Sequence, residues 1–287
     1  MEGIGVIDIS PFVQSAIPEE HCKNNVVENV LQALSSHGFM YVVGHGIPEE
    51  QLEASITNAC EFFYQSDEEK KKLLSHDRAK RGYAPLETEN FASLIGEKRP
   101  NDLCEKVRFG PSIPAESERC QYYSSKQARC HFTRNEWGDQ SRSFQETVSS
   151  YYEAMEQLTS TLLHIIARGL MLSPDVFTSK MDRHTSILSM NYYPPICAQA
   201  DNSPSTQLRV AEHTDVSMIT IVYQRTLSCS SCCMGWTGGG LEVWAGEEGQ
   251  WTSVPHIAGR NTPTPPRPPI LDEYTPFIHN CAMLYCV

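Results

Sequence analysis

The triplet His213-Thr214-Asp215 is the part of the sequence best suited to chemistry. On a β-strand, residues two apart point to the same face, so an imidazole and a carboxylate would converge here at hydrogen-bond or metal-ligand distance. Two such ligands and a second imidazole form the facial 2-His-1-carboxylate arrangement, which holds Fe(II) and leaves positions open on the metal. The alternative is a strand histidine that only hydrogen-bonds to a neighbouring carboxylate. The surrounding sequence has to separate these two interpretations.

Short strands are predicted around this triplet. β-Branched and aromatic residues, interrupted by turn residues, indicate extended segments over 186–193, 217–223, 241–244 and 251–254. Several short strands separated by turns are typical of a β-sandwich or barrel.

The N-terminal part of the chain alternates predicted strands and helices. A strand over 5–12, a helix over 18–36, a strand over 39–43 and a helix over 49–64 follow from the changes in hydrophobic period. This order is typical of a compact α/β unit. The charged run over 67–72 predicts a solvent-exposed helical turn.

The middle of the chain holds the clearest helix, over 143–170. Its apolar residues recur at helical spacing on one face, which predicts that it covers a sheet. Residues 82–135 are polar and irregular apart from a predicted strand over 105–109, and we expect the loops that select the substrate to lie there.

Composition excludes several classes of partner. The chain has 287 residues and a formal net charge of −12, which repels phosphate, so we expect neither nucleic acid nor a membrane as a partner. The 11 cysteines are scattered without framework spacing, and the first residues do not resemble a signal peptide. These features predict a cytoplasmic protein with reduced thiols. The cluster Cys229–Cys233 has half the spacing of a zinc site, without a matching second half.

Seven motifs occur along residues 4–259 in the order found in one known family. They are VIDIS at 6–10, HGFMYVVGHGIP at 37–48, FF and a following lysine within 62–70, MNYYP at 190–194, EHTDVS at 212–217, GGLEV at 239–243 and WTSVP at 251–255. In these motifs the chain resembles the isopenicillin-N-synthase-like branch of the 2-oxoglutarate/Fe(II)-dependent dioxygenases.

The resemblance implies an α+β fold with a double-stranded β-helix, or jelly-roll, core, an N-terminal α/β region and flanking helices. It implies four parts: an N-terminal dioxygenase region (4–118), a connecting segment with the long helix (119–183), an incomplete jelly-roll core (184–259) and a divergent Pro-rich tail (260–287).

The resemblance also assigns roles at the site. His213 and Asp215 match two iron ligands, and Asn191 and Tyr193 match positions that line the 2-oxoglutarate pocket. Fe(II) would be the cofactor and 2-oxoglutarate the co-substrate. The implied reaction couples decarboxylation of 2-oxoglutarate to the oxidation, by O₂, of a small organic substrate that the sequence does not name.

The sequence departs from this family near its end. The family's third ligand is a His followed by Arg-Val, and a downstream Arg-x-Ser anchors the distal carboxylate of 2-oxoglutarate; neither motif follows Gly259. His279 and His256 are the candidates for the third ligand. Residues 225–237 and 260–287 resemble the product of altered exon boundaries, and sequencing the transcript would test this. A catalytically impaired or inactive truncated isoform is therefore the alternative to an active oxygenase.

Overall fold

The computed structural model describes most of the chain. The described residues are 4–14, 19–36, 38–76, 81–113, 118–126, 128, 131–194, 207–213, 215, 217–224, 241–245, 250–254 and 277–284. Among them, no helix is both long and apolar enough to cross a membrane.

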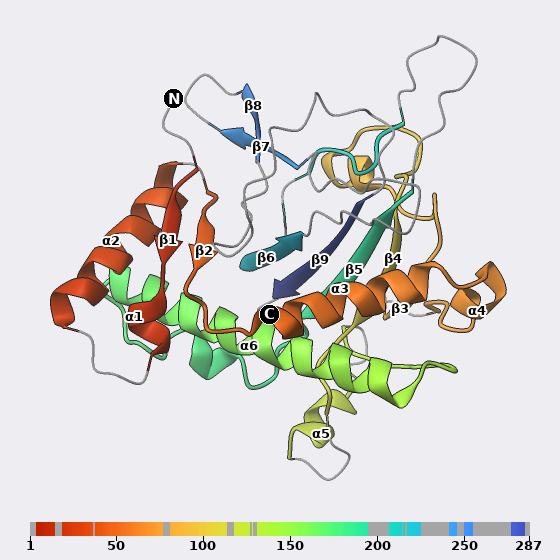
Figure 1. Ribbon diagram of the computed structural model, residues 1–287, viewed down its shortest axis with the longest axis horizontal. Helices are drawn as coiled ribbons and strands as arrows, with labels where there is room; N and C mark the ends of the chain where they lie inside the picture. Colours follow the sequence, from red (N-terminus) through yellow and green to blue (C-terminus); the bar gives the residue numbers. More distant parts are fainter. Residues whose placement is uncertain are drawn as a thin grey trace.

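A five-stranded antiparallel sheet forms the centre of the structure (Figure 1). Its strand order is β3-β4-β5-β9-β6. The strands are β3 (Gly82–Ala84), β4 (Glu105–Phe109), β5 (Ile187–Tyr193), β9 (Phe277–Leu284) and β6 (Ile219–Gln224). Two smaller sheets pair β1 (Val6–Asp8) with β2 (Tyr41–Val43) and β7 (Glu242–Ala245) with β8 (Gln250–Ser253).

Two long helices, α3 (Glu49–Phe63) and α6 (Arg142–Gly169), cross one face of this sheet (Figure 1). The other helical elements are α1 (Ser10–Val13), α2 (Glu20–Ser36), α4 (Asp67–Lys71), α5 (Glu118–Tyr123), η1 (Phe91–Ile95) and η3 (Thr178–Lys180). The helices and sheets together give the mixed α and β architecture expected from the sequence.

The first predicted strand is shorter than expected. Residues 5–12 divide into β1, which ends at Asp8, and the four-residue helix α1. The backbone N–H of Ser10 donates to the Asp8 carboxylate at 2.9 Å, and Pro11 lies in the first turn of α1, where the missing N–H of proline costs no hydrogen bond. Proline therefore begins a helix here rather than only ending a strand.

Side chains of β4 and β5 alternate between two different environments. Val107, Phe109, Leu188 and Met190 belong to the apolar core that also contains Phe62 of α3 and Phe144 of α6. Because alternate residues of a strand face opposite ways, Lys106, Arg108 and their β5 neighbours face away from the helices. These residues are nevertheless buried, with Lys106 only 4% exposed. The polar face of this sheet is thus an interior surface.

The last strand lies within the divergent tail at 260–287. There β9 pairs with β5 on one side and with β6 on the other. The prolines at 263–269 precede this strand and lie outside the described residues. The divergent tail therefore supplies an inner strand of the central sheet.

The N-terminus of α6 provides a test of local stability. The Ser141 hydroxyl oxygen accepts a hydrogen bond from the Phe144 backbone N–H at 3.1 Å, which satisfies one of the free donors of the first turn. We expect Ser141→Ala to lower the free energy of unfolding by about 1 kcal/mol in urea denaturation. Ser143→Ala, in the same exposed turn but past the cap, is the control and should be neutral or slightly stabilising. Equal effects of the two substitutions would contradict the capping role.

Candidate metal centre

His213 and Asp215 lie together in the segment that leads into β6. His213 Nε2 is 3.3 Å from Asp215 Oδ1, and both side chains are partly exposed to solvent. The expected convergence of imidazole and carboxylate is therefore present, although the residues precede the strand instead of lying within it.

The second nitrogen of His213 determines which atom faces Asp215. His213 Nδ1 lies 2.8 Å from the Ala211 carbonyl oxygen, which can only accept, so Nδ1 carries a proton and donates it. In the neutral His213 ring, Nε2 then carries a lone pair that is directed at an Asp215 carboxylate oxygen. Two acceptors at this separation need a proton or a metal cation between them. A backbone carbonyl that orients the non-ligating nitrogen is also the usual support of a metal-binding histidine. The pair therefore fits a divalent metal.

The same contact perturbs both ionisations. The hydrogen bond to Asp215 raises the pKa of His213 above its usual value, although burial acts in the opposite direction. The hydrogen bond with His213 lowers the pKa of Asp215, and Thr220 on β6 adds to the effect. Asp215 is thus held in its ionised, ligand-competent form.

Asn191 and Tyr193 lie on the polar interior face of β5. Asn191 is opposite Lys106 of β4 in the strand register and is 5% exposed, and Tyr193 is 3% exposed. Tyr193 also hydrogen-bonds to the Cys104 thiol, whose pKa burial raises to about 12. The two predicted pocket residues therefore share one buried face.

Phe91 links that face to His213, a role that the sequence did not reveal. The Lys106 ammonium lies 4.1 Å from the centre of the Phe91 ring. The centres of the Phe91 and His213 rings are 4.4 Å apart. Phe91 begins η1, within the irregular region that sequence patterns could not interpret. The contact depends on tertiary structure, because more than a hundred residues separate Phe91 from His213.

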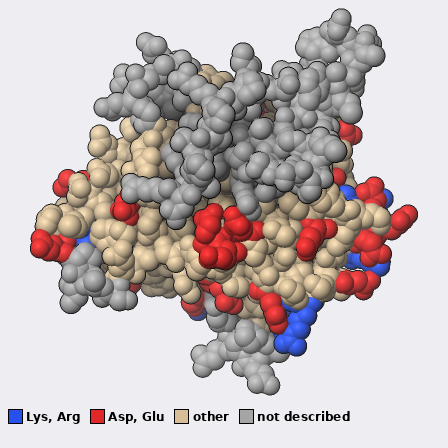
Figure 2. Space-filling view, viewed as in Figure 1, with Lys and Arg blue, Asp and Glu red and all other residues tan. Residues whose placement is uncertain are grey.

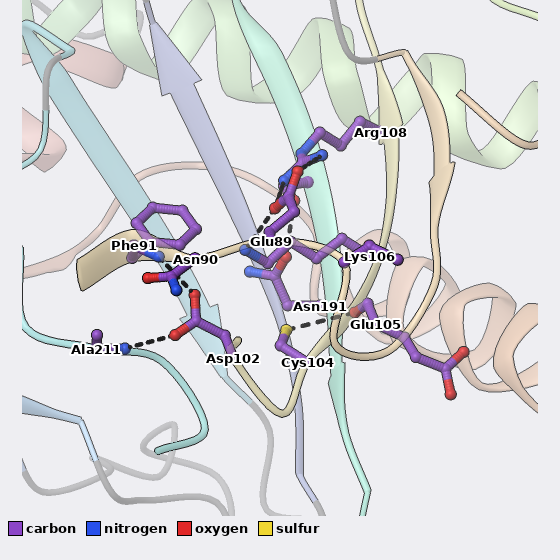
Figure 3. A network of polar contacts seen from close by, with 12 residues as sticks. Glu89, Asn90, Phe91, Asp102, Cys104, Glu105, Lys106, Arg108, Asn191 and Ala211 are labelled. Atoms are coloured by element: carbon purple, nitrogen blue, oxygen red, sulfur yellow. Dashed lines mark hydrogen bonds and ion pairs between the residues drawn. The ribbon is translucent and has the colours of Figure 1, made fainter. Parts of the chain in front are cut away.

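Asp102 fixes the two segments that carry these rings, as Figure 3 shows. Its carboxylate accepts the backbone N–H of Phe91 at 2.9 Å and that of Ala211 at 3.0 Å. Asp102 is 2% exposed. A buried carboxylate therefore ties η1 to the His213 segment through two charge-assisted hydrogen bonds.

Glu89 occupies the space between Lys106 and Arg108 (Figure 3). It binds Arg108 through both oxygens, one at 2.8 Å and one at 2.5 Å, and Lys106 Nζ at 3.0 Å. Burial alone would raise the pKa of Glu89, but the hydrogen bonds and charges of Arg108 and Lys106 outweigh it and hold the pKa well below its usual range. We call Lys106, Glu89 and Arg108 the buried triad.

The comparisons with known proteins point to one group of enzymes. A family model described as "non-haem dioxygenase in morphine synthesis N-terminal" matches residues 4–140. The chain is 28% identical to the 2-oxoglutarate-dependent dioxygenase citB of Monascus ruber over 254 residues, which cover 87% of this chain and 70% of that protein. It is 29% identical to the 2-oxoglutarate-dependent dioxygenase tropC of Talaromyces stipitatus over 268 residues, covering 89% and 74%.

Over most of its length the chain is therefore similar to 2-oxoglutarate-dependent dioxygenases.

Solved structures share the fold of this chain. A full-length Neurospora crassa protein, solved in complex with alpha-KG, aligns with a TM-score of 0.74 and 21% identity, covering 98% of this chain and 85% of that one. The rice dioxygenase for auxin oxidation aligns with a TM-score of 0.61 and 18% identity, covering 99% and 83%.

A facial Fe(II) site of two histidines and one carboxylate needs a third ligand besides His213 and Asp215. Within the described part of the chain, no three His, Cys, Asp or Glu side chains gather closely enough to hold a metal. His256 and the cysteine cluster at 229–233 lie outside the described residues. His279 is placed by its backbone on β9, opposite Asn191 of β5 and Gln224 of β6. In the strand register, His279 is thus the neighbour of Asn191, a predicted pocket residue.

Proposed function

We propose that this chain is a non-haem Fe(II) oxygenase that couples the decarboxylation of 2-oxoglutarate to the oxidation of a small organic substrate. The observation that carries the proposal is the His213–Asp215 pair, in which an oriented lone pair and a carboxylate face each other at 3.3 Å. His213 and Asp215 would hold the iron, and Asn191 and Tyr193 would line the 2-oxoglutarate pocket.

The relatives support an active enzyme over the inactive alternative, since the named relatives are 2-oxoglutarate-dependent dioxygenases. The same Neurospora crassa protein has also been solved with alpha-KG and thymine, which supports a small molecule as the class of substrate. Iron with 2-oxoglutarate would supply the oxidising chemistry: 2-oxoglutarate loses CO₂ to give succinate, one atom of O₂ enters succinate and the other oxidises the substrate. The residues of this chain bind and orient the reactants.

The finer architecture is part of the proposal. The five-stranded sheet, with helices on one face and a buried polar face on the other, supports a jelly-roll core built on residues 184–259 and completed by β9. Residues 4–118 would form the N-terminal region, 119–183 the connecting segment and 260–287 the tail, whose strand β9 joins the core sheet. Cys22 and Cys104 carry free thiols, which supports a cytoplasmic location.

Anaerobic titration with Fe(II) and then 2-oxoglutarate tests the proposal. A saturable visible charge-transfer band should form in the wild type and be lost in His213→Ala, whereas His21→Ala, whose imidazole is 74% exposed and distant in sequence from the site, should retain it. Absence of the band from folded wild-type protein would overturn the proposal. His279→Ala then tests the third ligand: loss of the band would assign His279, and an unchanged band would exclude it.

A further inference from the structure

The buried triad carries more positive than negative charge. Lys106 and Arg108 contribute two cations, and Glu89 contributes one carboxylate. The side chains of Lys106, Arg108 and Glu89 are 5%, 8% and 16% exposed, respectively. Burying an unbalanced charge is costly unless an opposite charge is supplied. Among the described residues, the ion-pair partner of both cations is Glu89; the nearby Asp102 carboxylate instead accepts two backbone N–H groups.

The Lys106 ammonium has capacity for a further acceptor. An ammonium group carries three N–H donors. Among the described residues, Glu89 is its hydrogen-bond acceptor, and the Phe91 ring contacts it through a cation–π interaction. Figure 3 shows this ammonium beside Asn191, on the polar face of the sheet.

The interior charge is opposite to that of the protein as a whole. The chain has a formal net charge of −12, and Asp and Glu side chains form the largest charged patches on the face seen in Figure 2. The acidic surface does not attract anions in general. The buried cations would therefore bind only an anion that enters the interior of the protein.

We propose that the buried triad binds a carboxylate group of a ligand, with Lys106 and Arg108 supplying the charge and Glu89 neutralising only part of it. A carboxylate at Lys106 would lie next to Phe91, whose ring also contacts His213, and so within reach of the metal centre. The carboxylate belongs either to 2-oxoglutarate or to an organic acid that is oxidised. This inference rests on the proposed function only for the choice of those two ligands.

Calorimetric titration of metal-free protein in EDTA separates this inference from the iron site. Glutarate is the first probe, because it has both carboxylates of 2-oxoglutarate but no 2-oxo group to chelate a metal. Phenylacetate, added to protein saturated with 2-oxoglutarate, is the second and represents an organic acid substrate. Lys106→Met should weaken binding of the responsible probe at least tenfold. Lys180→Met, which removes an exposed lysine of η3, should bind as the wild type does.

Glu89→Gln gives a result of the opposite sign. Removing the internal carboxylate leaves both cations available, so the same probe should bind at least threefold more tightly than to the wild type. A merely structural triad would instead lose binding in both variants. Circular dichroism checks that each variant is folded, and Lys106→Arg, which keeps the charge, should restore binding if Lys106→Met does not fold.

Each outcome decides the proposal. Glutarate binding that depends on Lys106 assigns the triad to 2-oxoglutarate, and phenylacetate binding that depends on Lys106 assigns it to the substrate. The proposal is overturned if the wild type binds neither probe, if Lys106→Met binds as the wild type does, or if Glu89→Gln weakens binding. None of these results depends on the Fe(II) titration.

Discussion

Glu105→Ala is expected to lower the free energy of unfolding by about 3 kcal/mol, because it leaves a buried ammonium poorly paired. The Glu105 carboxylate lies 2.7 Å from Lys70 Nζ and accepts the Tyr83 hydroxyl at 2.6 Å. The Lys70 and Glu105 side chains are 6% and 11% exposed. Burial, followed by the contact with Glu105, raises the pKa of Tyr83 well above its usual range, so the phenol remains a donor. Asp67 offers Lys70 only an exposed partner at 3.1 Å.

Urea denaturation measures this effect against a matched pair on the surface. Glu146→Ala breaks the exposed Arg142–Glu146 pair of α6 and should change the free energy of unfolding by no more than about 0.5 kcal/mol. The double variant Lys70→Met/Glu105→Leu should recover most of the loss, since it removes both buried charges. A loss below about 1 kcal/mol in Glu105→Ala would show that Lys70 does not need this partner.

Asp102→Ala is expected to impair both the fold and the proposed metal centre. It removes the acceptor of two buried backbone N–H groups, Phe91 N–H and Ala211 N–H, and each unsatisfied donor costs about 1–3 kcal/mol. We expect a loss of about 3 kcal/mol in the free energy of unfolding. Because Ala211 also accepts the Nδ1 proton of His213, we further expect weaker Fe(II) binding in protein that is still folded.

Two comparisons identify the reason for the loss. Asp102→Asn keeps the shape but directs an amide N–H₂ at one of the two donors, so it should lose nearly as much stability as Asp102→Ala. Asp182→Ala removes an exposed aspartate paired with Arg183 and should leave Fe(II) affinity and stability close to those of the wild type. Unchanged Fe(II) affinity in folded Asp102→Ala would separate Asp102 from the metal centre.

Local sequence patterns were sufficient to predict most of the helices and strands. The amphipathic period predicted a helix over 143–170, and α6 spans Arg142–Gly169. The β-branched run predicted a strand over 186–193, and β5 spans Ile187–Tyr193. These elements follow local periodicity because each has one face packed against a neighbouring layer.

The pattern of charged residues was the least reliable guide to which side chains are exposed to solvent. The run over 67–72 was expected to be solvent-exposed, but Lys70 is 5% exposed. Charged residues alternating with apolar ones in β4 have the pattern of a strand with one face in water, but Lys106 and Arg108 are buried. Their partners, Glu105 for Lys70 and Glu89 for the other two, are 35, 17 and 19 residues away in the sequence. No local pattern contains such pairings.

The sequence by itself determined the family motifs, the spacing of His213 and Asp215 and the elements around them. Tertiary structure decided how those residues are supported: Ala211 orients His213, Asp102 joins the two ring-bearing segments, and β9 enters the sheet between β5 and β6. The physical reason is that period and motif depend on near neighbours along the chain. The burial of a charge and the pairing of an inner strand depend instead on contacts that form only when distant segments meet.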